Sequence, residues 1–227
     1  MKNTLNILAI FALISLISSC MSLDKFSYLA NNHANSYYNI SKTENQQVKF
    51  TLQDKEEGIS QISTTNKRHT VVPLLFYNRI NINYLLKFNT EKQSRIIQEK
   101  LLKLMDSAGV MKQLVNKQQS LEINFEKIPT NIEYLENEHI IYFGIWYVQI
   151  GKEILQPTDN DIVVEIKIVE NNKIVRTKKI TATCDPLVIK NKFFSYQRFM
   201  DVFLTERDKN IRRASRKLFN DIYKEIN

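Results

Sequence analysis

The residues that could do chemistry are few and lie far apart along the chain. The sequence contains three histidines and two cysteines, the side chains that most often act as nucleophiles, proton shuttles or metal ligands. A zinc site would need the histidines to converge by folding alone, and we expect no metal site. The histidines are His33, His69 and His139, and the cysteines are Cys20 and Cys184.

Motifs that bind phosphate or carry out catalysis are missing from the sequence. It has no P-loop, no G-x-G-x-x-G, no G-x-S-x-G and no H-E-x-x-H. The run Asp159-Asn160-Asp161 begins like a calcium-binding loop but lacks the later Gly and Glu, so it predicts a turn before a strand. We therefore expect a protein that is not an enzyme and that carries no cofactor.

The first twenty residues have the organisation of a secretory signal. Lys2 supplies the positive region, Leu5 to Ile17 form an apolar core, and small residues follow. These 13 apolar-core residues are fewer than the ~20 that a helix needs to cross a bilayer. We predict that residues 1–19 are a signal peptide that directs export.

The end of this run, Leu16-Ile17-Ser18-Ser19-Cys20, resembles the lipobox of bacterial lipoproteins, in which an aliphatic residue and two small residues precede a cysteine. The resemblance implies that Cys20 becomes the first residue, with diacylglycerol on its sulfur and a fatty acid such as palmitate on its amine. Several acyl chains, at ~0.8 kcal/mol per buried CH₂, would anchor the protein firmly to a membrane. The alternative is an ordinary signal peptide followed by an incidental cysteine.

The net charge limits the kinds of partner, and the cysteine content limits disulfide formation. The net charge is +8, and removal of Lys2 with the signal peptide reduces it to +7 (8 − 1). A basic exported protein suggests anionic neighbours such as lipid head groups or cell-wall polymers, whereas export disfavours nucleic acid. The excess of positive charge could also reflect a composition rich in Lys and Asn.

If Cys20 carries lipid, Cys184 has no disulfide partner and is either a buried apolar residue or a free thiol.

Hydrophobic periodicity predicts an α+β fold. Residues 20–47 have no sustained period and predict a tether, and residues 48–227 can bury a single domain. Within it we expect a mostly antiparallel mixed sheet with two main amphipathic helices, Thr90–Ala108 and Thr205–Ile226, packed on it. Leu101 and Ile166 should face the core, and Arg207 should lie on an exposed helix face. The expected strands cover residues 48–52, 71–77, 121–125, 139–150 as one central strand, and 162–168 with 174–184 as a hairpin turning at Asn171-Asn172. Residues 80–84 alternate again and continue the second strand either as a hairpin or as a bulged extension.

From about Val71 to Ile226 this order of elements resembles small bacterial envelope lipoproteins of the YajG type and those related to the N-terminal domain of TolB. The features that carry the likeness are a helix ending in Ala108-Gly109, a hairpin from Ile162 to Thr183, and a closing helix. The resemblance implies an accessory role beside a larger envelope machine.

An aromatic segment followed by a basic helix is the candidate partner surface. Contiguous apolar side chains bounded by arginines are typical of interface cores. The alternative is that these aromatics close the bottom of the core. The surface comprises Phe193, Phe194, Tyr196, Phe199, Phe203, Arg212, Arg213 and Arg216.

Together these features predict a lipid-anchored, non-enzymatic binding or accessory module of the bacterial cell envelope. Met21, which follows the expected lipidated cysteine, resembles the sorting pattern for the outer membrane, with the domain on the periplasmic or the surface side. The expected partner is an envelope protein or an anionic polymer. The alternative is a surface-exposed lipoprotein that binds a host molecule or a lipid.

Overall fold

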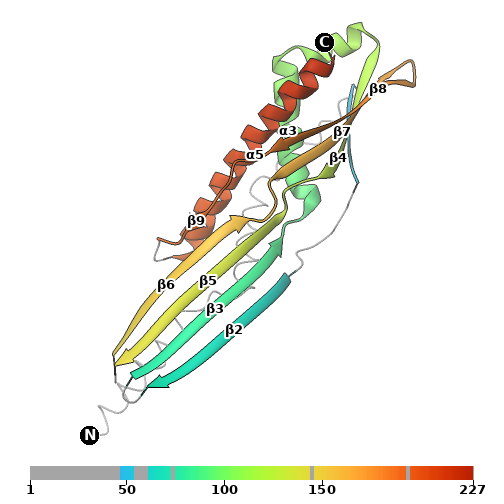
Figure 1. Cartoon of the computed structure of the whole chain (residues 1–227). Coiled ribbons are helices and arrows are strands. Elements are labelled where there is room, and N and C mark those ends of the chain that lie inside the picture. Colours follow the sequence, from blue (N-terminus) through green and yellow to red (C-terminus); the bar gives the residue numbers. More distant parts are fainter. Residues whose placement is uncertain (1–46, 54–60, 73–74, 144–145, 193–194, 227) are drawn as a thin grey trace, which may run out of the picture.

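The computed structural model describes residues 47–53, 61–72, 75–143, 146–192 and 195–226. Only the backbone is described at residues 61–72, 75–82, 84, 86, 92, 140, 142–143, 146–147 and 149. The expected signal peptide, Cys20 and the expected tether up to residue 46 lie outside the described residues. The described chain has the α+β fold that the sequence predicted, but it forms two sheets instead of one (Figure 1).

The first sheet has the strand order β1-β4-β7-β8. β1 runs parallel to β4, and the other two pairings are antiparallel. The predicted β7–β8 hairpin is confirmed: Asn171 and Asn172 have φ of 49° and 61°, the positive values that a two-residue hairpin turn requires. The strands are β1 (Val48–Leu52), β4 (Gln119–Lys127), β7 (Asp161–Glu170) and β8 (Lys173–Thr183).

Helices cover one face of this sheet. They are α3 (Thr90–Ser107), α4 (Val110–Asn116) and the second half of α5 (Tyr196–Ile226). Gly109 joins α3 to α4 with φ of 71°, a conformation that residues with a side chain seldom adopt. Leu101 and Ile166 are both fully buried in the core between helices and sheet, as their positions in the pattern predicted.

The second sheet is antiparallel throughout and has the order β2-β3-β5-β6-β9. The expectation of one central strand over residues 139–150 is wrong, because the chain reverses there and Phe143 pairs with Trp146. Polar residues from Gln61 onward, expected to precede a strand, already belong to β2. The expected strand over residues 71–77 is wrong, because Val72 pairs with Leu75 and the chain reverses within it. Residues 80–84 continue the strand after this reversal, β3. The strands are β2 (Gln61–Val72), β3 (Leu75–Lys87), β5 (Asn131–Phe143), β6 (Trp146–Pro157) and β9 (Ile189–Lys190).

Helix α5 spans both sheets (Figure 1). It begins at Tyr196, not at the predicted Thr205, and its 31 residues extend about 46 Å at about 1.5 Å per residue. Its first half buries its apolar stripe against β5 and β6 in a second, smaller core. Among the described residues no helix is long and apolar enough to span a membrane. The second core contains Phe88, Ile132, Tyr134, Leu155, Phe199, Met200, Phe203 and Leu204.

Candidate functional site

The aromatic part of the predicted partner surface is largely core. Phe199 and Phe203 have no exposed area, so their assignment to an exposed surface is wrong. They stand four residues apart on the buried stripe of α5, because that helix starts nine residues earlier than predicted. Tyr196 is half-buried, and Phe193 and Phe194 lie outside the described residues.

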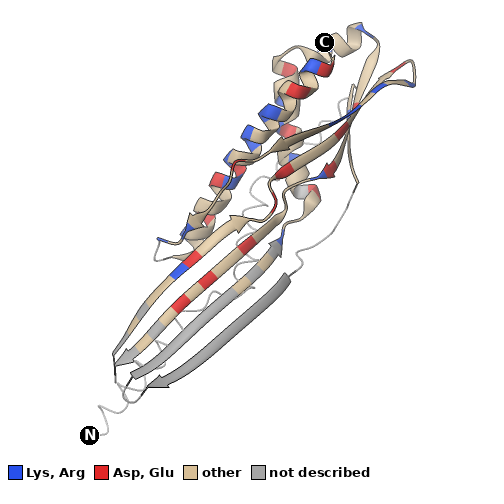
Figure 2. Ribbon diagram, in the orientation of Figure 1, with Lys and Arg blue, Asp and Glu red and all other residues tan. Residues whose placement is uncertain are grey.

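The basic part of that surface does lie on the outside of α5. Arg213 and Arg216 are exposed, and Arg212 is half-buried. From Lys209 to Lys217 the helix carries five cations and no acid, and we call this stretch the basic segment (Figure 2). Asp185 partly neutralises it, since one carboxylate oxygen lies 3.2 Å from the Lys217 amine and the other 3.9 Å from Arg213.

Three carboxylates that the sequence did not single out converge beneath the start of α5. Glu136 and Glu138 lie two residues apart on β5, and Glu153 stands directly opposite Glu136 on β6. These three residues, the acid cluster, are only 4 %, 5 % and 9 % exposed. Gly151 lies opposite Glu138 and makes room for the Glu138 side chain, because a Cβ atom at position 151 would lie 2.8 Å from the Glu138 Cγ.

Phenol and amide groups hold the acid cluster in place. The Tyr134 hydroxyl donates to Glu136 Oε2 at 3.0 Å, and the Tyr196 hydroxyl donates to Glu153 Oε1 at 2.9 Å. The Asn191 side-chain amide donates to the other Glu153 oxygen. Tyr196, predicted to face a partner, therefore ties the first turn of α5 to strand β6.

The environment of the acid cluster favours a proton on Glu136. Burial, followed by the negative charges of Glu138 and Glu153, raises its pKa from 4.5 to about 7, against the lowering effect of the Tyr134 hydrogen bond. Burial and the neighbouring carboxylates also raise the pKa values of Tyr134 and Tyr196. A carboxyl group that titrates near neutrality can serve acid–base chemistry, but the burial of all three acids closes them to a substrate in this conformation.

Arg207 is also buried, so its predicted place on an exposed helix face is wrong. The side chain is 4 % exposed. Its Nη1 donates to Gln93 Oε1 at 2.7 Å, its Nη2 donates to the Pro129 carbonyl, and its guanidinium carbon lies 4.7 Å from the centre of the Phe88 ring. Burial lowers the pKa of Arg207, and Asp208 opposes that change most strongly.

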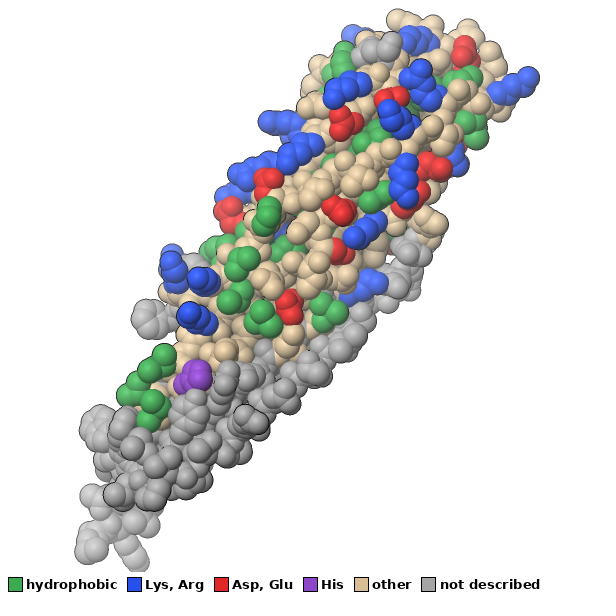
Figure 3. Space-filling view, in the orientation of Figure 1, with side chains coloured by type: hydrophobic (Ala, Val, Ile, Leu, Met, Phe, Trp, Pro, Cys, Tyr) green, Lys and Arg blue, Asp and Glu red, His purple; other side chains and the backbone are tan. Residues whose placement is uncertain are grey.

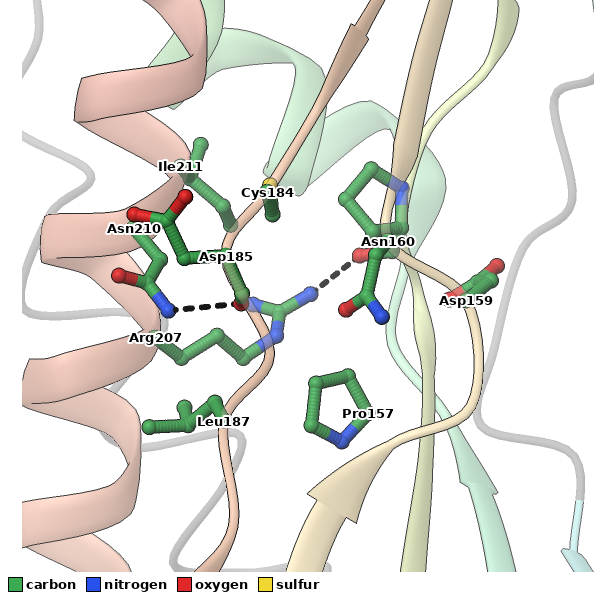
Figure 4. Close-up of a pocket in the computed structure, with 10 residues that line it drawn as sticks. Pro157, Asp159, Asn160, Cys184, Asp185, Leu187, Arg207, Asn210 and Ile211 are labelled. Atoms are coloured by element: carbon green, nitrogen blue, oxygen red, sulfur yellow. Dashed lines mark hydrogen bonds between the residues drawn. The ribbon is translucent and has the colours of Figure 1, made fainter.

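Arg207 lies where the chain crosses between the two sheets (Figure 4). Four described connections meet there, and backbone hydrogen bonds join them in pairs: Phe88 N to the Thr130 carbonyl at 2.9 Å and Cys184 N to the Asn160 carbonyl at 2.7 Å. The connections are residues 88–89, 128–130, 158–160 and 184–188.

A small cavity adjoins Arg207 at this crossing. Its volume is about 10 Å³, which is room for about one water molecule. Asn160 is one of its lining residues, and the buried Oδ1 of Asn160 has no hydrogen-bond partner among the described residues. The size fits a structural water and is far below the ~300 Å³ of small-molecule sites.

Cys184 and the run before β7 agree with their predictions. Cys184 is buried, and burial raises its thiol pKa to about 11, so the thiol stays protonated near neutral pH. Asp159-Asn160 forms the turn before β7, and Asp161 opens the strand. Among the described residues no three His, Cys, Asp or Glu side chains are placed to hold a metal ion.

Two signals in the sequence could have revealed the buried charges. Phe203, Arg207 and Ile211 follow one another at four-residue spacing, which puts Arg207 on the buried stripe once α5 is extended to Tyr196. Ile132, Tyr134, Glu136 and Glu138 alternate at the period of a strand, so one buried face continues from apolar to acidic residues.

Comparison of the chain with protein-family models, with curated proteins and with solved structures found no match.

Proposed function

We propose that this protein is a lipid-anchored binding module of the bacterial cell envelope, without enzymatic activity and held at a membrane through Cys20. The observation that carries the proposal is the sequence Leu16-Ile17-Ser18-Ser19-Cys20 directly after an apolar core of signal-peptide length. The domain would stand on the periplasmic or surface side of the outer membrane and bind an envelope protein or an anionic polymer.

The basic segment of α5 supports a binding role. Arg213 and Arg216 project from a helix whose opposite face is already buried on the first sheet, so both side chains are accessible to a partner. Charged groups on a rigid helix steer an oppositely charged partner and set its orientation. The partner would therefore present carboxylates or phosphates.

Replacing Cys20 with Ala tests the anchor. The variant should accumulate unprocessed or soluble and should no longer partition into the detergent phase when cells are extracted with a detergent that separates on warming. Cys184→Ala is the matched control, because it removes the other cysteine from a buried site and should leave partitioning unchanged. Normal partitioning of the Cys20 variant would refute lipid anchoring.

The double variant Arg213→Glu/Arg216→Glu tests the basic segment. Both side chains are exposed, so the protein should stay folded, while crosslinking in cells to its partner should fall at least tenfold because attraction becomes repulsion. Lys103→Glu/Lys112→Glu makes the same change of charge on α3 and α4 and should leave crosslinking intact. Equal crosslinking by both double variants would remove the basic segment from the partner surface.

A further inference from the structure

Two hairpins of the second sheet turn at the same end of the molecule (Figure 1). Val72 pairs with Leu75 at the β2–β3 turn and Phe143 with Trp146 at the β5–β6 turn. The two turns lie side by side, because Phe76 pairs with Tyr142 across β3 and β5. We call the described residues of this region the hairpin end: Val71–Val72, Leu75–Asn78, Ile140–Phe143 and Trp146–Gly151.

The composition of the hairpin end is that of a membrane interface. None of its residues is charged, and both strand pairs carry aromatic residues. Tryptophan and tyrosine combine an apolar ring with a polar group, and for that reason they concentrate at the boundary between hydrocarbon and water. The aromatic residues are Phe76, Tyr77, Tyr142, Phe143, Trp146 and Tyr147.

Two large apolar side chains of the hairpin end are exposed, and a third, Ile141, is half-buried. Val148 is 47 % and Ile150 is 59 % exposed, and they lie on the same side of β6, two residues apart. Figure 3 shows hydrophobic side chains beside a histidine at this end of the molecule. All described helices lie toward the other end of the molecule (Figure 1).

A row of basic residues crosses the sheet behind the hairpin end. The backbone register places Arg68 opposite Arg79 and Arg79 opposite His139. Four residues separate Arg79 from Leu75, which is about 13 Å at about 3.3 Å per residue. This spacing lets the apolar residues reach the interfacial layer of a leaflet while the cations face its head groups. In the described sheet the open edges of β2 and β6 keep the hairpin end out of the dry hydrocarbon, where unpaired backbone groups are too costly.

We propose that the hairpin end inserts into the interfacial layer of one leaflet of a lipid bilayer, with Arg68 and Arg79 at the level of anionic head groups. The charge pattern favours a bilayer because an uncharged end bounded by two arginines complements a surface with an anionic rim and an apolar interior, and the nearest acid, Glu138, is buried. The inference rests on the proposed function, since the anchor at Cys20 would hold the domain beside the membrane and allow modest apolar contacts to suffice.

The only tryptophan in the chain, Trp146, lies at the hairpin end and reports insertion directly. Lipidated full-length protein is reconstituted into vesicles of phosphatidylethanolamine and phosphatidylglycerol with brominated acyl chains. We expect a blue-shifted emission, quenching of at least half of it by the bromolipid, and several-fold protection from aqueous iodide. Emission that iodide quenches freely and bromolipid does not would overturn the proposal.

A matched pair of double variants keeps the test specific. Val148→Glu/Ile150→Glu changes exposed residues of the hairpin end and should reduce bromolipid quenching several-fold. Ile174→Glu/Val175→Glu changes residues of β8 that are similarly exposed, at 58 % and 54 %, and should leave quenching unchanged. Equal quenching of both variants would contradict insertion through this end.

Three further experiments separate membrane insertion from lipid anchoring and from association of two copies of the chain. Full-length Cys20→Ala protein is mixed with the same vesicles. If bromolipid quenches Trp146 in this variant, which carries no lipid, insertion is supported independently of the anchor. If the lipidated wild-type protein shows no quenching, the anchor is supported and insertion is wrong. Replacing phosphatidylglycerol with phosphatidylcholine should weaken quenching several-fold. A blue shift that needs no vesicles and grows with protein concentration would assign the hairpin end to a second copy of the chain and overturn membrane insertion.

Discussion

Replacing Arg207 with Met should lower the free energy of unfolding by about 3–5 kcal/mol, the range for breaking a buried charged network by removing one member. Met fills a similar volume, but it leaves Gln93 Oε1 and the buried Pro129 carbonyl without their donors. It also removes the cation from the face of the Phe88 ring. Urea denaturation followed by far-UV circular dichroism measures the loss.

Two further variants separate the hydrogen bonds of Arg207 from its charge. Arg207→Lys keeps the charge but cannot serve both acceptors with a planar fork, so its loss should be intermediate. Arg213→Ala, on the exposed side of the same helix, should change the free energy of unfolding by less than about 0.5 kcal/mol. A loss of under about 1 kcal/mol for Arg207→Met would show that Arg207 does not hold the crossing segments together.

The position of Arg207 also predicts a change in cooperativity. In the wild-type protein α5 and the crossing segments connect both cores, so the two sheets should unfold together. The fluorescence of Trp146 reports the second sheet, and far-UV circular dichroism reports both sheets and the helices. In Arg207→Met the two transitions should separate, because the buried link between the sheets is lost.

Elements with strong local signals were predictable from the sequence. Helix α3 has an apolar stripe ended by Gly109, and the β7–β8 hairpin has strict alternation around two asparagines that accept positive φ. The α+β class followed from these elements. Their residues carry enough local preference to select one structure before the rest of the chain packs.

Features that depend on long-range register were not predictable in the same way. The run from His139 to Ile150 is apolar throughout, so no polar turn marks the reversal that pairs Phe143 with Trp146. The start of α5 was misplaced because its aromatic first turns looked like an exposed surface, although β5 and β6 bury Phe199 and Phe203. The acid cluster also needs this pairing, since only the β5–β6 register brings Glu153 opposite Glu136.

Glu136→Gln should stabilise the protein by roughly 3 kcal/mol at pH 8 and by nothing at pH 4. The pKa of Glu136 is about 7 in the folded protein against 4.5 when unperturbed, because burial and then Glu138 and Glu153 oppose its negative charge. At about 1.4 kcal/mol per pH unit this difference corresponds to roughly 3 kcal/mol. Glutamine resembles the protonated acid, since its carbonyl can accept the Tyr134 hydroxyl and its amide can donate to Glu138.

The direction of the pH dependence follows from which state holds the proton. Below pH 4.5 Glu136 is protonated in both the folded and the unfolded chain, so it makes no difference to stability. Between pH 4.5 and about 7 the unfolded chain releases this proton while the folded chain keeps it, so stability falls as the pH rises. Above about 7 both states are ionised and the folded protein carries the full cost of a buried charge.

Urea denaturation of wild type and variant from pH 4 to pH 8 therefore gives two curves that meet at low pH and diverge through this window. Taking their difference removes the contributions of titrating groups that do not interact with Glu136. Glu122→Gln is the matched control, because it replaces a half-buried carboxylate of β4 in the first sheet by an amide, outside the acid cluster. If the curves of wild type and Glu136→Gln run parallel from pH 4 to pH 8, Glu136 does not hold its proton more tightly in the folded protein than in the unfolded chain, and the prediction is wrong.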